Sequence, residues 1–176
     1  TVEADSRDLP DSLAGRFDLV YSTIGVLCWI DDVDAWMASV VRSLRPGGAL
    51  VLVELHPLLT AVDSIGPLVI DFPYGFDGPH VYSGTGSYAG VETEPWTTVQ
   101  YGHSLGEVVT AALDAGLVVE RLEEHLSMAF DPRALGAPVE ADGRYRLRLG
   151  SGSATDPTAV APPLPVLYTL IARSPD

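Results

Sequence analysis

The chain of 176 residues contains no lysine: all ten of its basic residues are arginines, and 24 acidic residues bring the net charge to −14. Such a surface repels phosphate backbones and anionic lipid headgroups, so we expect neither nucleic acid nor a membrane as a partner. The absence of lysine also excludes Schiff-base catalysis and the phosphate-binding lysine of a P-loop.

Cysteine and long apolar runs are scarce as well. Cys28 is the only cysteine, which excludes an internal disulfide and suits a reducing cytoplasm, where we expect the protein to work. No uninterrupted apolar run approaches the roughly 20 residues that cross a bilayer, and the polar N-terminus does not resemble a signal peptide. His80 and His125 show no ligand spacing with other residues, so we expect no metal site.

The first residues do not have the form of a natural start. The chain begins at Thr1 rather than at methionine, and residues 1–5 read as the tail of a strand already under way. We therefore expect a segment upstream of Thr1.

Residues 17–55 have the pattern of a complete strand–helix–strand unit. Phe17 to Ser22 is short, aromatic and β-branched, as a buried strand would be. Three aspartates then supply negative charge at a helix start, and an apolar stripe follows at helical period. The stripe consists of Val33, Trp36, Met37, Val40, Val41 and Leu44. Pro46-Gly47-Gly48 predicts the helix end. Residues 49–55, which are apolar except at Glu54, predict a central parallel strand.

The rest of the chain divides into three parts. Residues 58–100 are rich in glycine and aromatic residues, which favours an ordered lid or substrate wall over a linker. Residues 104–125 begin with Ser104 and Glu107 in capping-box spacing, which predicts a helix that ends at Gly116 and a strand after it. Residues 144–149 suggest a short hairpin, and 166–173 predict a final strand.

The order of these elements resembles the second half of class I S-adenosylmethionine-dependent methyltransferases. The residues that carry the resemblance are Val2-Glu3-Ala4-Asp5 with Leu9-Pro10, Phe17-Asp18-Leu19-Val20, Leu44-Arg45-Pro46-Gly47-Gly48, His103-Ser104-Leu105-Gly106-Glu107 and Asp114-Ala115-Gly116-Leu117. The resemblance covers nearly all of residues 1–176 and implies a partial methyltransferase domain with a Rossmann-like α/β fold. Its mostly parallel sheet would have seven strands, of which this chain supplies the fourth onward, with an antiparallel final strand and the N-terminal strands absent. No G-x-G-x-G loop, which in the family cradles the cofactor, occurs in the chain.

The resemblance implies an enzyme that transfers a methyl group from S-adenosylmethionine to a small-molecule acceptor. Asp5 matches the position that accepts a hydrogen bond from the adenine amino group, with Ser6 beside it. The family's loop after the first clear strand meets the methionine part of the cofactor, and here it begins with Ser22, Thr23 and Ile24. Ligands of open parallel sheets bind at this edge, which also makes these three residues candidates on physical grounds.

Glu54, His56 and His103 are the catalytic candidates, each with a structural alternative. A histidine near its ordinary pKa could take a proton from a hydroxyl or amine nucleophile. Glu54 and His56 could instead be a structural acceptor and part of a turn, and His103 could hold a helix start. Methyl transfer to a good nucleophile can also proceed by positioning alone.

A second function class stays open at this point. The first clear strand would expose an unpaired edge, which is a site for pairing with another chain. The chain could therefore be a non-catalytic binding or assembly module, and a homodimer could form through this edge or through the insertion.

Overall fold

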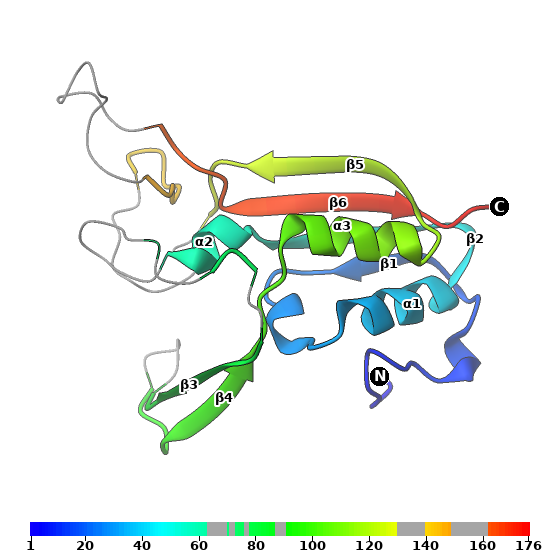
Figure 1. Ribbon diagram of the computed structural model, residues 1–176, viewed down its shortest axis with the longest axis horizontal. Helices are drawn as coiled ribbons and strands as arrows, with labels where there is room; N and C mark the ends of the chain where they lie inside the picture. The colour runs from blue at the N-terminus through cyan, green and yellow to red at the C-terminus, as the bar shows by residue number, and fades with distance from the viewer. Residues whose placement is uncertain (63–69, 71–72, 76–77, 87–90, 130–139, 149–161) are drawn as a thin grey trace.

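The computed structural model describes residues 1–62, 70, 73–75, 78–86, 91–129, 140–148 and 162–176. Its body is a four-stranded sheet in the order β1-β2-β6-β5 (Figure 1). The strands are β1 (Phe17–Ser22), β2 (Leu44–Leu55), β5 (Val118–His125) and β6 (Leu167–Arg173). β1 pairs with β2 in parallel, while β6 runs antiparallel to both β2 and β5. Three strands thus share one direction, which confirms the α/β fold with a mostly parallel sheet and an antiparallel final strand.

Two helices cover the same face of the sheet, α1 (Val33–Ser43) and α3 (Leu105–Asp114) (Figure 1). α1 begins where the aspartates predict, because the Asp32 carboxylate accepts the Ala35 N–H at 2.8 Å. α3 begins with the predicted capping box, in which Ser104 and Glu107 satisfy each other's backbone N–H groups. Short elements complete the chain: η1 (Asp11–Leu13), η2 (Leu27–Trp29), α2 (Pro57–Ala61), β3 (His80–Gly84) and β4 (Trp96–Gln100).

The Leu44–Gly48 segment departs from the prediction. It was expected to be a turn before the strand, but β2 already begins at Leu44, which pairs with Phe17. The register of the β1–β2 pairing shifts over this segment, because Phe17 pairs with Leu44 and Leu19 already pairs with Ala49. The residues that were expected to form a turn therefore form an irregularity within β2. Gly47 has a φ of +70°, a left-handed conformation that favours glycine. Its N–H donates to the carbonyl of Ser174, so this segment is held by the C-terminal end of the chain.

The main core lies between the sheet and the two helices. Its fully buried side chains come from both layers: Met37, Leu50, Leu52, Val108, Ala112, Leu170 and Ala172. A second, smaller cluster lies beyond the end of β2: Leu59, Val62, Met128, Tyr145, Leu147 and Val166. The apolar stripe predicted for α1 therefore faces the sheet, since Val33, Trp36, Met37 and Val40 are all buried.

The predicted hairpin at 144–149 is wrong in its pairing over the residues that the structure describes. Tyr145 pairs with Met128 and Leu147 with Leu164, so 144–148 bridges two other segments. The alternation of apolar and basic residues is correct for an extended segment, but alternation does not specify which partner it pairs with.

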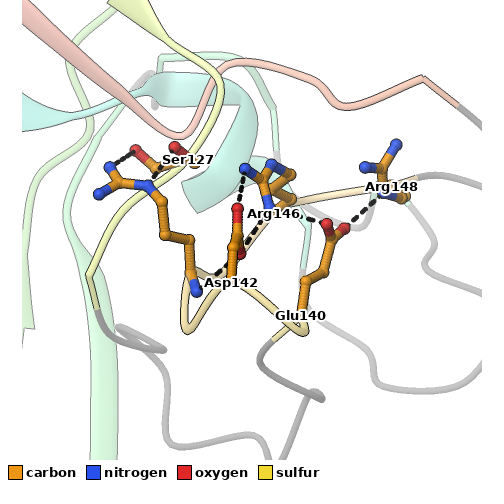
Figure 2. A network of polar contacts seen from close by, with 6 residues as sticks. Ser127, Glu140, Asp142, Arg146 and Arg148 are labelled. Atoms are coloured by element: carbon orange, nitrogen blue, oxygen red, sulfur yellow. Dashed lines mark hydrogen bonds and ion pairs between the residues drawn. The ribbon is translucent and has the colours of Figure 1, made fainter.

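The arginines of this segment form an ion-pair network on its outer side (Figure 2). Arg146 contacts Glu140 at 2.7 Å and Asp142 at 2.6 Å, and Arg148 contacts the other oxygen of Glu140. Arg144 donates to the Ser127 hydroxyl at 2.7 Å. The Arg146 guanidinium holds the pKa of the Asp142 carboxyl at about 2. The network joins residues within 140–148, whose Tyr145 and Leu147 belong to the second apolar cluster.

The 58–100 insertion contains α2 and an antiparallel hairpin of β3 and β4, which extends away from the sheet (Figure 1). The Trp96 ring packs on Gly84, and its indole N–H donates to the Gly86 carbonyl at 2.8 Å. Phe72, Phe76 and Tyr88, which contribute to the aromatic character of the insertion, lie outside the described residues. A lid role of this insertion stays a prediction.

Residues 1–5 form no strand, contrary to expectation. The segment that follows them lies along α1 instead, since the Leu9 N–H donates to the Ser39 hydroxyl at 3.0 Å. Arg42 of α1 holds the same segment through the Leu9 carbonyl and the Asp8 carboxylate. In the described part of the chain, no helix has the length and apolar character needed to cross a membrane.

We expect Leu52→Ala to lower the free energy of unfolding by about 3 kcal/mol, because it leaves a cavity in the main core. Leu52 is fully buried, whereas Leu113 on α3 is 54% exposed and provides the matched control. Leu113→Ala should change the stability by less than about 0.5 kcal/mol. Urea unfolding followed by circular dichroism measures both variants, and equal losses would contradict this assignment of the core.

Candidate functional site

The candidate site lies at the sheet edge where β1 and β2 end. Ser22 is the last residue of β1, and only 7% of it is exposed. Its hydroxyl oxygen is buried and has no hydrogen-bond partner among the described residues. Buried polar groups are nearly always hydrogen-bonded, so an orphaned hydroxyl at a strand end favours a ligand as its partner.

Glu54 organises the loop that follows β1. Its carboxylate is buried and accepts three successive backbone N–H groups: those of Gly25 at 2.7 Å, Val26 at 2.9 Å and Leu27 at 3.1 Å. A fourth bond comes from the N–H of Leu55 at 2.7 Å. Gly25 has a φ of +87°, a conformation that glycine tolerates best. These bonds match the structural alternative for Glu54, that of an acceptor.

His56 is engaged at both of its ring nitrogens. It is the N-cap of α2, where Nδ1 accepts the Leu58 N–H at 3.1 Å. The proton therefore resides on Nε2, which donates to the Glu124 carboxylate at 2.8 Å. Burial lowers the pKa of His56, an effect that Glu124 opposes only in part. This geometry favours a neutral structural histidine over a general base.

His103 joins the start of α3 to the loop after β1. Its Nε2 donates to the Ile30 carbonyl at 2.7 Å, and its Nδ1 lies 3.0 Å from the Glu107 carboxylate. Only 5% of the side chain is exposed. The ring borders a cavity of about 220 Å³, whose walls are Asp31, Gly78, Pro79, Tyr101, Gly102, His103 and Glu107. His103 thus holds the helix start and lines a cavity next to the candidate site.

The N-terminal segment reaches the same loop through Arg7. The Arg7 guanidinium contacts the carboxylates of both Asp5 and Asp31, and Asp31 lies just before α1. Hydrogen bonds from the Arg7 side chain, and then from the Arg7 backbone N–H, lower the pKa of Asp5 to about 2. Asp5 is therefore ionised and half-exposed, as a hydrogen-bond acceptor for a ligand should be. Ser6 is half-buried in the turn between Asp5 and Arg7.

Side chains of the loop after β1 differ in exposure. Thr23 is exposed and Ile24 is half-buried, so both can reach a ligand. Cys28 has a pKa raised to about 11, mainly by burial and then by the Glu54 carboxylate, so it is not a nucleophile near neutral pH. Trp29 is 56% exposed, so its side chain does not belong to the core.

The structure brings together most of the residues that the sequence predicts for the site. Five of them lie at or just after the ends of two neighbouring strands: Ser22, Thr23, Ile24, Glu54 and His56. His103 contacts the loop after β1 at Ile30, and Asp5 is linked to Asp31 through Arg7. Three residues were missed: Arg7, Glu124 and Tyr168. Arg7 had a signal, because Asp5 lies two residues before it, but Glu124 is 68 positions from His56. Tyr168 is fully buried opposite Glu54, and burial raises its pKa far above the usual value.

Metal chemistry has no support in the described segments of the chain. They contain no group of three or more histidine, cysteine or acidic side chains that could hold an ion.

Comparison with known proteins gives one sequence match and several structural ones. A family model described as "Methyltransferase domain" matches residues 1–52. No curated protein sequence matches the chain significantly.

Solved structures match over nearly the whole chain. The S-adenosylmethionine-dependent methyltransferase from Mesorhizobium loti is 22% identical, with a TM-score of 0.57 over 97% of this chain and 67% of that protein. A putative methyltransferase of this kind from Listeria monocytogenes is 12% identical, with a TM-score of 0.57 over 98% of this chain and 68% of that protein. The glycopeptide N-methyltransferase MtfA is 16% identical, with a TM-score of 0.52 over 99% of this chain and 60% of that protein.

These matches define the extent of the likeness. The chain spans about two thirds of the length of the first two structures, and at these identities the likeness establishes the fold. The sequence match to the methyltransferase family model covers residues 1–52, which end within β2. The chain therefore has the fold of S-adenosylmethionine-dependent methyltransferases, and its first 52 residues also match a methyltransferase family model.

Proposed function

We propose that the edge formed by the ends of β1 and β2 binds S-adenosylmethionine and that the protein transfers its methyl group to a small-molecule acceptor. The observation that carries this proposal is the orphaned Ser22 hydroxyl at the end of β1. A polar ligand that fills this edge would supply the missing hydrogen bond. The cysteine content suits a reducing compartment, and we propose the cytoplasm as the location.

The residues at this edge fit the cofactor. Asp5, ionised and half-exposed, can accept a hydrogen bond from the adenine amino group, and Ser22 can bond a polar atom of the methionine part. Thr23 and Ile24 continue the same wall. The bound group supplies a methyl that is activated by its sulfonium. The chain's own contribution is a fixed loop and a partly buried edge that exclude water from the reacting atoms.

The cavity beside His103 is our candidate place for the acceptor. Its volume of about 220 Å³ is smaller than the roughly 300–1,000 Å³ of whole ligand pockets, so it would hold part of an acceptor. Its walls include two carboxylates and a tyrosine ring, which suit a polar or basic group. MtfA, which shares the fold, is a glycopeptide N-methyltransferase, and this supports an amine among the acceptors to be tested.

We propose that catalysis depends on positioning rather than on a histidine base. The ring nitrogens of His56 and His103 contact protein groups, and the Glu54 carboxylate accepts four N–H groups. A base must have a lone pair within reach of the proton that it removes. All three residues therefore act on the shape of the site.

An assembly role is the second candidate, because one observation favours it. β1 pairs only with β2 among the described strands, and three of its apolar residues, Phe17, Leu19 and Tyr21, are exposed. An exposed apolar edge is a template for another strand. We propose that two copies of the chain can pair there.

The role of Ser22 is tested by Ser22→Ala. The free variant should be at least as stable as the wild type, because the substitution removes an unsatisfied buried hydroxyl. Its dissociation constant for S-adenosylhomocysteine should rise about fivefold, which corresponds to about one hydrogen bond. Calorimetry measures the affinity, and Ser83→Ala in the β3–β4 hairpin is the control. Unchanged affinity of Ser22→Ala would remove the main support for the proposed site.

The structural role of His56 is tested through pH. Because burial lowers its pKa in the folded state, the unfolded chain takes up the proton first as the pH falls below about 6.5, and stability is lost there. His56→Asn keeps an N-cap acceptor but does not titrate, so its melting temperature should fall less between pH 7.5 and 5.5. His80→Asn should behave as the wild type. Loss of methyl transfer in His56→Asn with an unchanged pH profile of stability would instead indicate a catalytic base.

The assembly candidate is tested by Leu19→Glu, which places a charge on the exposed edge. Light scattering after size exclusion should show a dimer for the wild type and a monomer for this variant. Leu126→Glu, at an exposed leucine after β5, should remain dimeric. A monomeric wild type at all concentrations would exclude pairing through β1.

A further inference from the structure

We propose that Glu54 is a positioning residue whose carboxylate fixes the loop between β1 and α1, and that this loop shape sets the affinity for the cofactor. The inference rests on the proposed function for its second half only. Its first half, the control of the loop by Glu54, is independent of any ligand.

The geometry is that of an internal anion in a nest of backbone donors. The N–H groups of Gly25, Val26 and Leu27 converge on one carboxylate that lies 27 to 29 positions later in the sequence. Hydrogen bonds to a charged acceptor are about twice as strong as neutral ones, and burial strengthens them further. Glu54 is only 5% exposed, so water does not compete for these donors.

The loop that Glu54 holds lies between the proposed cofactor site at Ser22 and the cavity beside His103. Ser22 precedes it, and the Ile30 carbonyl at its other end accepts the hydrogen bond from His103. A change in the shape of the loop would therefore move the cofactor wall and the cavity wall together. Because Glu54 already accepts the N–H groups of Gly25, Val26 and Leu27, these donors are unavailable to a carboxylate on a ligand. Such a carboxylate must be bound elsewhere.

Cys28 provides a natural reporter of the loop. It is the only cysteine of the chain, lies within the loop, and its thiol is within 3.5 Å of the Gly25 carbonyl. Its alkylation by iodoacetamide should be slow in the folded wild type, because Cys28 is half-buried and its thiol has a pKa of about 11.

The principal test is Glu54→Gln, which keeps the size of the side chain but turns an NH₂ group toward backbone donors. We expect the alkylation rate of Cys28 to rise at least about tenfold, and the KM for S-adenosylmethionine to rise by a similar factor while kcat changes less. Glu123→Gln is the matched control, since Glu123 is an exposed acid paired with Arg121 and does not touch the loop.

A second variant separates the loop shape from the charge. Glu54→Gln also removes a negative charge that raises the pKa of Cys28, and this alone would speed alkylation. Val26→Pro keeps Glu54 but deletes one of the three donors, and the φ of Val26, −87°, is close to the range that proline adopts. We expect Val26→Pro to raise the alkylation rate as well, by a smaller factor. This variant also serves if Glu54→Gln does not fold.

The outcomes are distinct. Faster alkylation in both variants with weaker S-adenosylhomocysteine binding supports the whole inference. Faster alkylation while the wild type binds no S-adenosylhomocysteine supports the control of the loop and overturns the proposed cofactor site. Wild-type alkylation rates in Val26→Pro, or wild-type affinity in a folded Glu54→Gln, overturn the positioning role.

Discussion

The rest of the structure depends on the position of β2 within the sheet. It is hydrogen-bonded to β1 on one side and to β6 on the other, and its inward side chains Leu50 and Leu52 are fully buried under the helices. Because it is held on both sides, the residues at its end have fixed positions. Glu54 and His56 therefore reach across to the loop after β1 and to β5, and they join three strand ends into one edge.

Local features of the fold could be predicted, because neighbours in the sequence determine them. The stripe of α1, its Asp32 cap and the capping box of α3 each depend on residues within a few positions of one another. The predictions that were wrong concern segments whose partners are distant in the sequence. The Leu44–Gly48 segment was read from its turn residues, yet its partners are Phe17 and the C-terminal end of the chain. Residues 144–148 have the alternation of a strand, but alternation does not name a partner.

The candidate site follows the same division. That polar residues at strand ends would meet could be inferred from the parallel sheet alone. The role of each side chain could not be inferred, because its partners are distant in the sequence. His56 bonds Glu124, 68 positions away, and Glu54 accepts three N–H groups that lie 27 to 29 positions away. The sequence placed Glu54 and His56 at the end of a strand, where the structure also has them, but it left two roles open for each. The contacts favour the structural role, because they engage the lone pairs that a catalytic base would use.

The acidic residues near the ends of β1 and β2 would affect the affinity of the proposed site for a charged ligand. Asp5, Asp31 and Glu107 lie around the proposed binding region, and the Arg7 guanidinium neutralises only part of the first two. Charges within a Debye length of about 8 Å act on one another at physiological salt, and partly buried charges are screened less. An acidic edge therefore favours a positively charged sulfonium over the neutral thioether that remains after methyl transfer. Asp5, Asp31 and Glu107 would thus favour binding before the reaction and release after it.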